Sequence, residues 1–381
     1  DVHVNGIWID LEQKIILNGD LKYKNLQTFD FNGYILPMKK EDNINFDLEF
    51  KDMNLAFANA FMEPEVISDI SGTIKGVIKA TGSIADPDIS GSLMLKNGGL
   101  KVGILGTHYN LSGPLRFDGE NDGIYGSFPV MDDEGNTAYA IATIFHNDFK
   151  DISLSFDVSF DESVSGFRDP VSKRPLAPTE RFMVLNTSYK EGTVYYGKAY
   201  ATGTASILIE QGNTEINVSA KTRKDTEVFL PLYGAKEISE FDFIDFSTDS
   251  IIEDKKLDLS GVNLNLDITA TPDAKIKLIL NEQTNEWLEA TGHGNILLSV
   301  GSDDEIKMTG QYTINKGQYE FVLNPIRKTF EIDQGSNITW TGDPLNANLN
   351  IKAFYRVNAS LDELNRDQIG GSTVTKSEVR C

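Results

Sequence analysis

The sequence is poor in the residues that usually build covalent links and metal centres. It has one cysteine, Cys381, which excludes an internal disulfide, and four scattered histidines (His3, His108, His146 and His293), which argue against a histidine-rich metal site. It has no run close to the roughly 18 apolar residues that a membrane helix needs. Basic residues are also scarce, because 35 Lys and Arg face 57 Asp and Glu. The net charge of −22 argues against a nucleic-acid partner, since attraction to phosphate needs the opposite sign.

Motifs of known catalytic chemistry are absent as well. The sequence has no nucleophile elbow, phosphate loop, paired-histidine zinc motif or dinucleotide fingerprint. The segment from Asp118 to Gly123 begins like a calcium loop, but Pro129 stands where the bidentate glutamate belongs. We therefore expect an ordinary acidic turn there, and for the whole chain no metal, no cofactor and no enzymatic role.

What the chain has in abundance is alternation of apolar and polar residues, the period-2 pattern of a strand with one buried face. The run from Ile44 to Phe50 places every apolar side chain on one face and every charged or amide side chain on the other. Turn sequences such as Asp86-Pro87-Asp88 and Asn315-Lys316-Gly317 separate the runs and predict antiparallel neighbours. The sequence therefore predicts an all-β chain.

Helical periodicity is confined to two short segments. Apolar spacing and alanine content between Leu55 and Ser68 predict one or two helical turns, and Leu361–Arg366 is a second candidate. Helices are thus too few to cover a sheet of this length.

Alternation fails in two places. The proline-containing stretch between Phe160 and Arg181 is either a linker between domains or a long surface excursion between two strands of one sheet. The acidic stretch from Glu237 to Lys256, with aromatic residues interspersed, is either a loop held by its aromatics or a partner-binding segment.

The apolar face of an amphipathic sheet must be covered, because large exposed apolar patches are rare on soluble monomers. Two architectures fit the pattern. One is a β-sandwich whose inner faces interdigitate. The other is one long curled antiparallel sheet whose concave, apolar face holds acyl chains. Alternation alone does not separate them, since a groove wall and a sandwich core share the same pattern.

An ordered series of motifs in the C-terminal half resembles the C-terminal domain of the TamB family, in its Bacteroidetes form. The series runs through Thr309–Phe321, Arg327–Ile332, Gly335–Trp340, Gly342–Ala347 and Leu349–Ile351. Val228–Leu232 and Phe241–Phe246 fit the same branch, and Gly72–Leu95 resembles the repeat units of the wider AsmA-like group. The resemblance covers Ser71 to Val357 and is strongest after Leu257.

This resemblance implies a long β-groove, taco-like in section and apolar inside, in the periplasm of a Gram-negative bacterium. It implies an inner-membrane anchor that lies outside this segment, and a BamA-like outer-membrane barrel partner, of the TamA type or a lipoprotein variant. Two functions are linked to the family. One is carriage of phospholipids between the inner and outer membranes. The other is support for assembly or secretion of outer-membrane β-barrel proteins and autotransporters. The composition also permits a third interpretation, an acidic extracellular β-sandwich adhesion module.

The domain organisation expected from these patterns has two parts. Residues 1–70 form an upstream β segment with a short helix, and residues 71–381 form the TamB-like groove domain, truncated at its C-terminal end. The assembly function would use unpaired strand edges at Val2–Asp10 and at the C-terminal end, where a barrel strand could pair.

Lipid carriage needs a continuous apolar lane instead. Each buried methylene of an acyl chain contributes about 0.8 kcal/mol, and an inward charge would interrupt the lane. We predict that the following alternating residues line it: Val262, Leu264, Leu266, Ile268, Ile276, Leu278, Leu280, Ile296, Leu298, Val300, Tyr319, Phe321, Leu323, Ile332, Ile338, Trp340 and Ile351.

Overall fold

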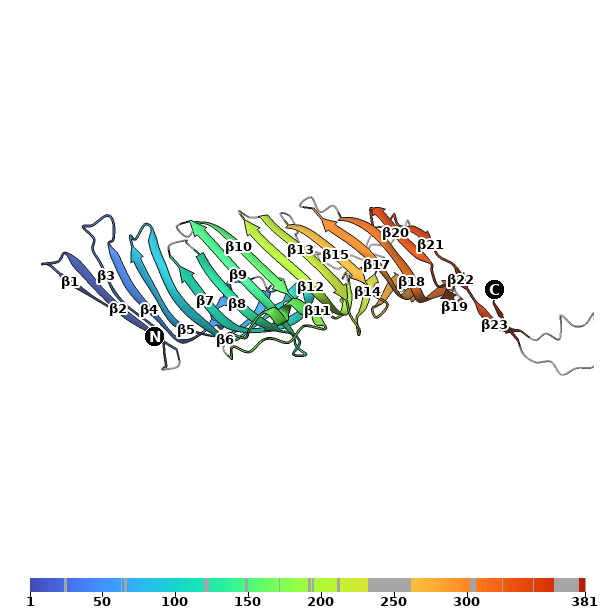
Figure 1. The fold of residues 1–381 in the computed structure, drawn as a ribbon, viewed down its shortest axis with the longest axis horizontal. Coiled ribbons are helices and arrows are strands. Elements are labelled where there is room, and N and C mark those ends of the chain that lie inside the picture. Colours follow the sequence, from blue (N-terminus) through green and yellow to red (C-terminus); the bar gives the residue numbers. More distant parts are fainter. Residues whose placement is uncertain are drawn as a thin grey trace, which may run out of the picture.

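The structure, a computed structural model, describes residues 1–23, 26–62, 64, 67–119, 123–147, 150–170, 172–190, 193, 195–210, 213–231, 262–301, 306–323, 325–344, 346–359 and 377–380. Among these residues, 22 strands form one sheet, and β23 and β24 pair as a separate two-stranded sheet. Figure 1 shows an elongated molecule along which the strands follow one another largely in sequence order. The predicted all-β chain is confirmed.

The strands of the first half are β1 (Val2–Ile9), β2 (Lys14–Tyr23), β3 (Leu26–Ile35), β4 (Ile44–Asn54), β5 (Ile67–Gly82), β6 (Pro87–Val102), β7 (Thr107–Asp118), β8 (Gly123–Met131), β9 (Thr137–Asn147), β10 (Lys150–Ser159) and β11 (Phe182–Thr187). Those of the second half are β12 (Tyr196–Glu210), β13 (Asn213–Thr222), β14 (Glu227–Pro231), β15 (Val262–Ala270), β16 (Lys275–Asn281), β17 (Glu286–Val300), β18 (Ile306–Leu323), β19 (Ile326–Ile332), β20 (Asn337–Gly342), β21 (Asn348–Asn350), β22 (Ala353–Phe354), β23 (Arg356–Ala359) and β24 (Ser377–Arg380). Three short 3₁₀ helices interrupt the series: η1 (Leu55–Phe61), η2 (Gly103–Leu105) and η3 (Glu162–Gly166).

The large sheet has two walls. In the long wall the strands pair in the order β1 to β10, then β12, β13, β15, β17, β18, β20 and β21. In the short wall the order is β11, β12, β14, β16, β17, β18, β19 and β22. β12, β17 and β18 belong to both walls, because the two halves of each strand have different neighbours.

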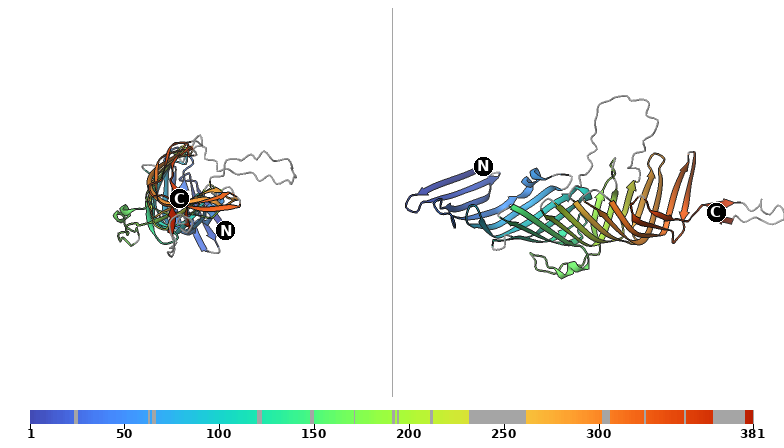
Figure 2. Two further views of the ribbon diagram at one scale, coloured as in Figure 1. Left: turned by 90° about the vertical axis from the view of Figure 1, so that its right-hand side faces the viewer. Right: turned by 90° about the horizontal axis from the view of Figure 1, so that it is seen from above.

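A register shift joins the two walls in β17 and β18. Gly294–Val300 pairs with β15 in the long wall, whereas Glu286–Thr291 pairs with β16 in the short wall. Between these halves the β17–β18 register skips Asn315. One extra residue restores the alternation after the bend, so that the apolar side chains of both halves face the same side. Figure 2 (left) shows the sheet curled when it is viewed end-on.

Glycines allow neighbouring backbones to approach closely where the long strands coil. Gly310 in β18 has a φ of +125°, and a Cβ there would overlap the carbonyl oxygen of Asn295 on β17. Gly203 in β12 has a φ of +156° and stands in the same relation to the carbonyl of Ser219 on β13. Residues with a side chain would push the strands apart at both positions.

The predicted antiparallel pairing holds with two exceptions. β13 pairs with β15, and β14 with β16, in parallel. Parallel neighbours need a long crossover connection rather than a tight turn. The chain between Pro231 and Val262 makes this connection, and all of it, including the acidic Glu237–Lys256 stretch, lies outside the described residues. Turn chemistry could not reveal these pairs because no short turn joins them.

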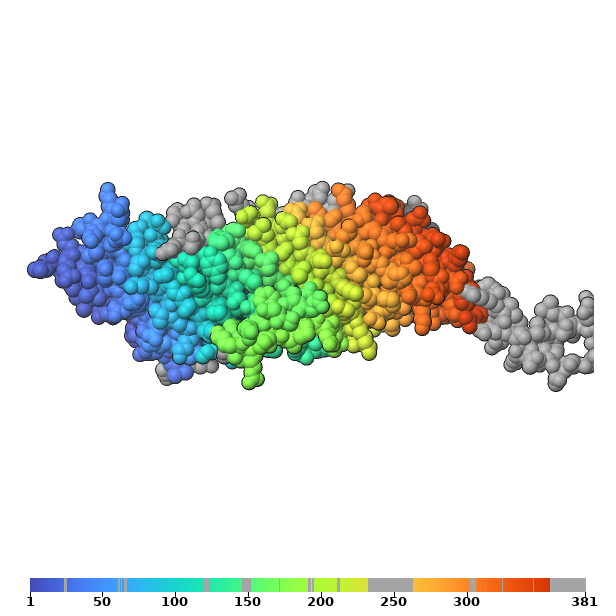
Figure 3. All heavy atoms as spheres, viewed as in Figure 1, coloured from blue at the N-terminus to red at the C-terminus, as the bar shows by residue number. Residues whose placement is uncertain are grey.

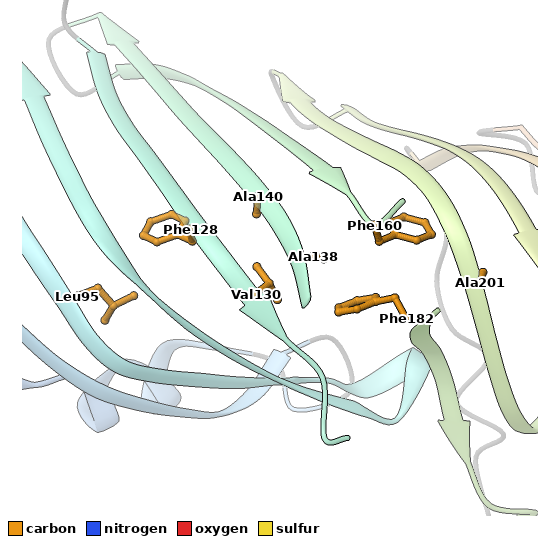
Figure 4. Packing of buried hydrophobic residues seen from close by; sticks show 8 residues of the cluster. All are labelled: Leu95, Phe128, Val130, Ala138, Ala140, Phe160, Phe182 and Ala201. Atoms are coloured by element: carbon orange, nitrogen blue, oxygen red, sulfur yellow. The ribbon is translucent and has the colours of Figure 1, made fainter. Parts of the chain in front are cut away.

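The core consists of two clusters on the inner face, at the level of the bend. Figure 4 shows eight residues of the first cluster. Seven of them come from β6, β8, β9, β11 and β12, and Phe160 directly follows β10. Tyr109 stacks on Phe182 with ring centroids 5.4 Å apart and donates a hydrogen bond to the Met183 carbonyl, which ties β7 to β11. The second cluster contains Ala270, Ala290, Ile296, Tyr312, Ile314 and Ile332.

The short helix predicted at Leu55–Ser68 is present as η1, a 3₁₀ helix that ends at Phe61. The Asn54 side chain caps it by accepting from the Ala56 amide at 2.7 Å. The candidate helix at Leu361–Arg366 lies outside the described residues.

β5 runs across residue 70 and pairs with both β4 and β6, so residues on either side of that position share one sheet. The two-part division at residue 70 stays a prediction.

The stretch between Phe160 and Arg181 is a surface excursion between β10 and β11. Phe167 stacks on the outward-facing ring of Tyr139 with centroids 4.0 Å apart, and Val164 is fully buried beneath it. The Thr179 amide donates to the Asp161 carbonyl at 3.1 Å and closes the loop. Figure 2 (right) shows the excursion projecting from one side of the sheet, and Figure 3 shows it lying over neighbouring strands.

A charged network anchors the excursion to the outer face. Glu134 contacts Lys198 Nζ at 2.6 Å and Arg181 at 2.9 Å, and it accepts a hydrogen bond from the Tyr200 hydroxyl at 2.6 Å. The hydrogen bond from Lys198, followed by that from Tyr200, lowers the pKa of the Glu134 carboxyl. Beside it, buried Asp132 accepts hydrogen bonds from three backbone amides and one side-chain amide.

Candidate binding groove

The inner face of the long wall carries an unbroken row of apolar residues in direct cross-strand register. Residues directly opposite each other in a sheet point to the same face. The row contains one residue from each of fifteen strands: Val2, Leu21, Phe29, Phe50, Gly76, Leu93, Leu115, Gly126, Ala142, Phe156, Ile207, Ile216, Leu264, Val300 and Ile306. Every member is apolar or glycine. We call this set the long apolar row.

A second row runs parallel to it, two residues closer to the bend. It passes through Phe128, Ala140, Val158, Ala205, Val218, Leu266, Leu298, Met308 and Gly342. It contains no polar residue either. The rows differ in exposure along the chain, since Phe128 and Ala140 are buried whereas Leu266 and Leu298 are half-buried. The two core clusters thus form a packed floor of the inner face, and apolar surface such as that of Leu266 and Leu298 stays accessible beside it.

The outer face of the same strands is polar. Asn217 and Asn265 lie opposite each other there, and the Asn265 amide donates to the Asn217 side chain at 2.9 Å. Apolar exceptions on this face include Val77, Ile141 and Leu208. Leu297 is another, 52% exposed between Asp267 and Thr309. The two faces of the sheet thus differ in chemistry, as the period-2 pattern predicts.

The structure places most of the predicted lane residues on one continuous inner surface. On the long wall these are Leu264, Leu266, Ile268, Ile296, Leu298, Val300, Ile338 and Trp340. On the short wall they are Ile276, Leu278, Tyr319, Phe321, Leu323 and Ile332. Members of both walls meet in the second core cluster, which contains Ile296. Ile276 and Tyr319 of the short wall and Trp340 of the long wall pack against this cluster.

Exposure divides the predicted residues into groups. Ile296 and Ile332 are buried in the second core cluster, Val300 and Ile338 are buried outside it, and Leu323 is 61% exposed at the end of β18. The other residues placed on the two walls are half-buried. Their role in lipid contact stays a prediction.

Three predicted residues stand apart from the cross-strand rows. Leu280 lies at a register shift in β16, between Ile279 and Asn281. Ile351 lies beyond β21 and is half-buried against the second core cluster. The side chain of Val262 is outside the described part of the chain.

Sequence reasoning missed the inner-face residues of β1 to β10 as lane candidates. Phe29, Phe31, Phe46 and Phe50 form an aromatic group on β3 and β4 with centroid separations of 5.0 to 6.3 Å. Their alternation is as clear as that of the later strands. The signal is present in the sequence, but the predicted lane starts only at Val262 because the family resemblance is strongest after Leu257.

Polar groups approach the inner face near the open end of the short wall. Lys328 lies opposite Phe321, and its Nζ donates to the Tyr355 hydroxyl at 3.0 Å and lies 4.4 Å from the centre of that ring. The Tyr319 hydroxyl donates to Glu286. Burial, followed by the hydrogen bond to Glu286, raises the pKa of Tyr319 to about 12. These contacts leave the two apolar rows of the long wall free of charge.

The described residues also bear on two other classes of site, membrane-spanning helices and metal centres. No helix there is long and apolar enough to cross a membrane. Nor does this part of the chain gather three or more His, Cys, Asp or Glu side chains in an arrangement suited to a metal ion.

Comparison with known proteins assigns the family. The model of the TamB C-terminal domain matches residues 127–380, about two thirds of the chain. No curated protein and no solved structure matches the sequence. The match includes the motif series after Leu257 and most strands of both walls. From the family model and the curled all-β sheet together, we conclude that this chain belongs to the TamB family.

Proposed function

We propose that this chain carries phospholipids along its inner face, as the periplasmic part of a protein that connects the inner and outer membranes. The observation that carries the proposal is the long apolar row, in which fifteen strands contribute apolar residues or glycine in direct register. The family is linked in general to assembly of the bacterial envelope, which agrees with this role.

The length of the row suits lipids arranged one after another. Strands lie about 4.8 Å apart, so fourteen spacings extend over roughly 67 Å. An acyl chain that spans half of a hydrocarbon core about 30 Å thick covers roughly 15 Å. Several acyl chains therefore fit along the row, and each methylene that leaves water for it contributes about 0.8 kcal/mol.

Mass spectrometry of an organic extract of the purified chain tests the proposal. We expect phospholipid to co-purify, and to be exchanged for labelled phospholipid when the stripped protein is incubated with vesicles. A folded chain that neither retains nor takes up phospholipid would refute lipid carriage.

A second candidate function, support for outer-membrane protein assembly, is favoured by the edge of β1 that no described strand covers. This strand pairs with β2 along all eight of its residues, and no other described strand pairs with it. A partner strand could therefore pair with its exposed backbone groups. Alternate residues direct their N–H groups to opposite sides of a strand. Val4 and Asn5 are adjacent, so one of them directs its N–H group to the uncovered edge and the other directs its N–H group to β2. Proline at the first position removes a donor from the uncovered edge, and proline at the second disturbs pairing with β2.

The assembly function predicts that the edge-facing proline abolishes capture of a BamA-like barrel in the full-length protein, with the fold unchanged. Equal capture by the parent and both proline variants would exclude β1 as the docking edge.

A further inference from the structure

Tyr312 is a buried tyrosine whose hydroxyl has no hydrogen-bond partner among the described residues. The residue is 4% exposed and belongs to the second core cluster, on the floor of the inner face. Two other tyrosines of the sheet have partners, since Tyr109 donates to the Met183 carbonyl and Tyr200 donates to Glu134.

The sheet makes room for this ring. Tyr312 lies opposite Gly294, and a Cβ added to the neighbouring Gly292 would lie 2.8 Å from Tyr312 Cζ. The hydroxyl end of the ring therefore lies over Gly292, between the two walls. Its other cross-strand neighbour is the buried side chain of Ile338.

A phenylalanine would fill the same apolar space without a hydroxyl. A buried donor left without an acceptor costs about 1 to 3 kcal/mol, so the hydroxyl is unfavourable unless something accepts from it. Burial raises the pKa of Tyr312 to about 12, with no charged neighbour contributing. The hydroxyl is therefore a permanent donor in a neutral, apolar setting, and such a setting disfavours a charged phosphate as its acceptor.

We propose that the Tyr312 hydroxyl donates a hydrogen bond to the ester carbonyl of a bound glycerolipid, so that the groove selects ester-linked over ether-linked lipids. The inference rests on the proposed lipid carriage and names the chemical class of the cargo. An ester carbonyl is a neutral acceptor attached directly to the acyl chain, and it can enter an apolar lane where a headgroup cannot.

The Tyr312 hydroxyl is buried, so a lipid carbonyl reaches it only if side chains near it move. Half-buried side chains that pack against the same cluster are candidates for this movement. Met308, Trp340 and Ile276 are among them. Met308 is unbranched and flexible, which suits a side chain that must be displaced when a ligand enters.

The experiment compares the parent chain with Tyr312→Phe, which removes only the hydroxyl. Both proteins are stripped of lipid and incubated with vesicles that contain equal amounts of diester and diether phosphatidylethanolamine with matched chains. Bound lipid is then quantified by mass spectrometry. We expect the parent to enrich the diester lipid roughly fivefold, the effect of one neutral hydrogen bond, and Tyr312→Phe to bind both lipids equally.

Stability provides a second readout. Because the substitution removes an unsatisfied donor, the stripped Tyr312→Phe protein should melt at a higher temperature than the parent. Tyr200→Phe is the matched control on the outer face, since its hydroxyl is satisfied by Glu134. It should melt at a lower temperature and keep the fivefold preference for diester lipid.

The outcomes separate this inference from the proposed function. Binding of both lipids by the parent without preference would overturn the role of Tyr312 but leave lipid carriage standing. A lower melting temperature for Tyr312→Phe would also overturn it, because the hydroxyl would then be satisfied inside the protein. Failure of the folded parent to bind either lipid would refute lipid carriage and this inference with it.

Discussion

Leu298 and Leu297 are adjacent residues of β17 that face opposite sides of the sheet, and they allow a paired test of the apolar lane. Leu298 lies opposite Leu266 and Met308 on the inner face. Leu297 lies opposite Asp267 and Thr309 on the outer face. Leu298→Arg therefore places a charge among apolar side chains, whereas Leu297→Arg places the same charge on a polar surface.

The size of the effect follows from the contacts that an acyl chain would lose. Leu298 is half-buried, so the arginine stem can extend and keep its guanidinium in water. The charged group and its hydration would then displace two to three methylenes of a bound chain. At about 0.8 kcal/mol each, the loss is about 2 kcal/mol, or roughly thirtyfold in affinity.

The assay is phospholipid bound per protein after re-isolation from vesicles, with circular dichroism to verify that both variants are folded. We expect Leu298→Arg to lose most of its lipid and Leu297→Arg to keep the level of the parent. Equal lipid in the two variants, whether both retain it or both lose it, would contradict the assignment of the inner face as the lane.

Three further predictions concern stability. Asp132→Ala should lower the free energy of unfolding by roughly 3 kcal/mol in urea denaturation, because four buried or half-buried donors lose their acceptor; exposed Asp133→Ala should have little effect. Glu134→Gln should lower the melting temperature at pH 7, because the folded-state pKa of this carboxyl is depressed by Lys198. The ionised carboxyl stabilises the folded state above its ordinary pKa of 4.5, and this stabilisation is lost as the pH falls through the lower folded-state pKa. The melting temperatures of parent and variant should therefore converge in acid. A constant difference in melting temperature down to pH 3 would contradict a stabilising role of the Glu134 charge. Gly310→Ala should cost roughly 1 to 3 kcal/mol, since its positive φ and the carbonyl of the adjacent strand leave no room for a Cβ; unchanged urea stability would show that the strands can separate there at no cost.

Much of the strand content could be predicted because its signal is local. Alternation from Ile44 to Phe50 and from Leu264 to Ile268 is visible within a few residues, and the structure has strands at both places. Which side chains share a face follows directly from that period of two. The family motifs added the curled architecture, which alternation alone could not distinguish from a sandwich.

The position of the Phe160–Arg181 excursion could not be predicted in this way. Loss of alternation showed that the chain leaves the sheet, but a linker and an excursion have the same local signature. Long-range contacts decide between them: Phe167 against Tyr139, and Arg181 against Glu134. Such contacts join residues that no sequence pattern relates.

The amino-acid pattern alone predicts amphipathic strands with one apolar face and one acidic, polar face, because that property depends only on neighbouring residues. The tertiary structure alone decided that β13 and β14 meet later strands in parallel and that fifteen apolar positions align into one row. It also showed that the Tyr312 hydroxyl is buried with no acceptor in the described part of the chain. Each of these depends on register between strands far apart in the chain, which is set by coiling and packing of the whole sheet.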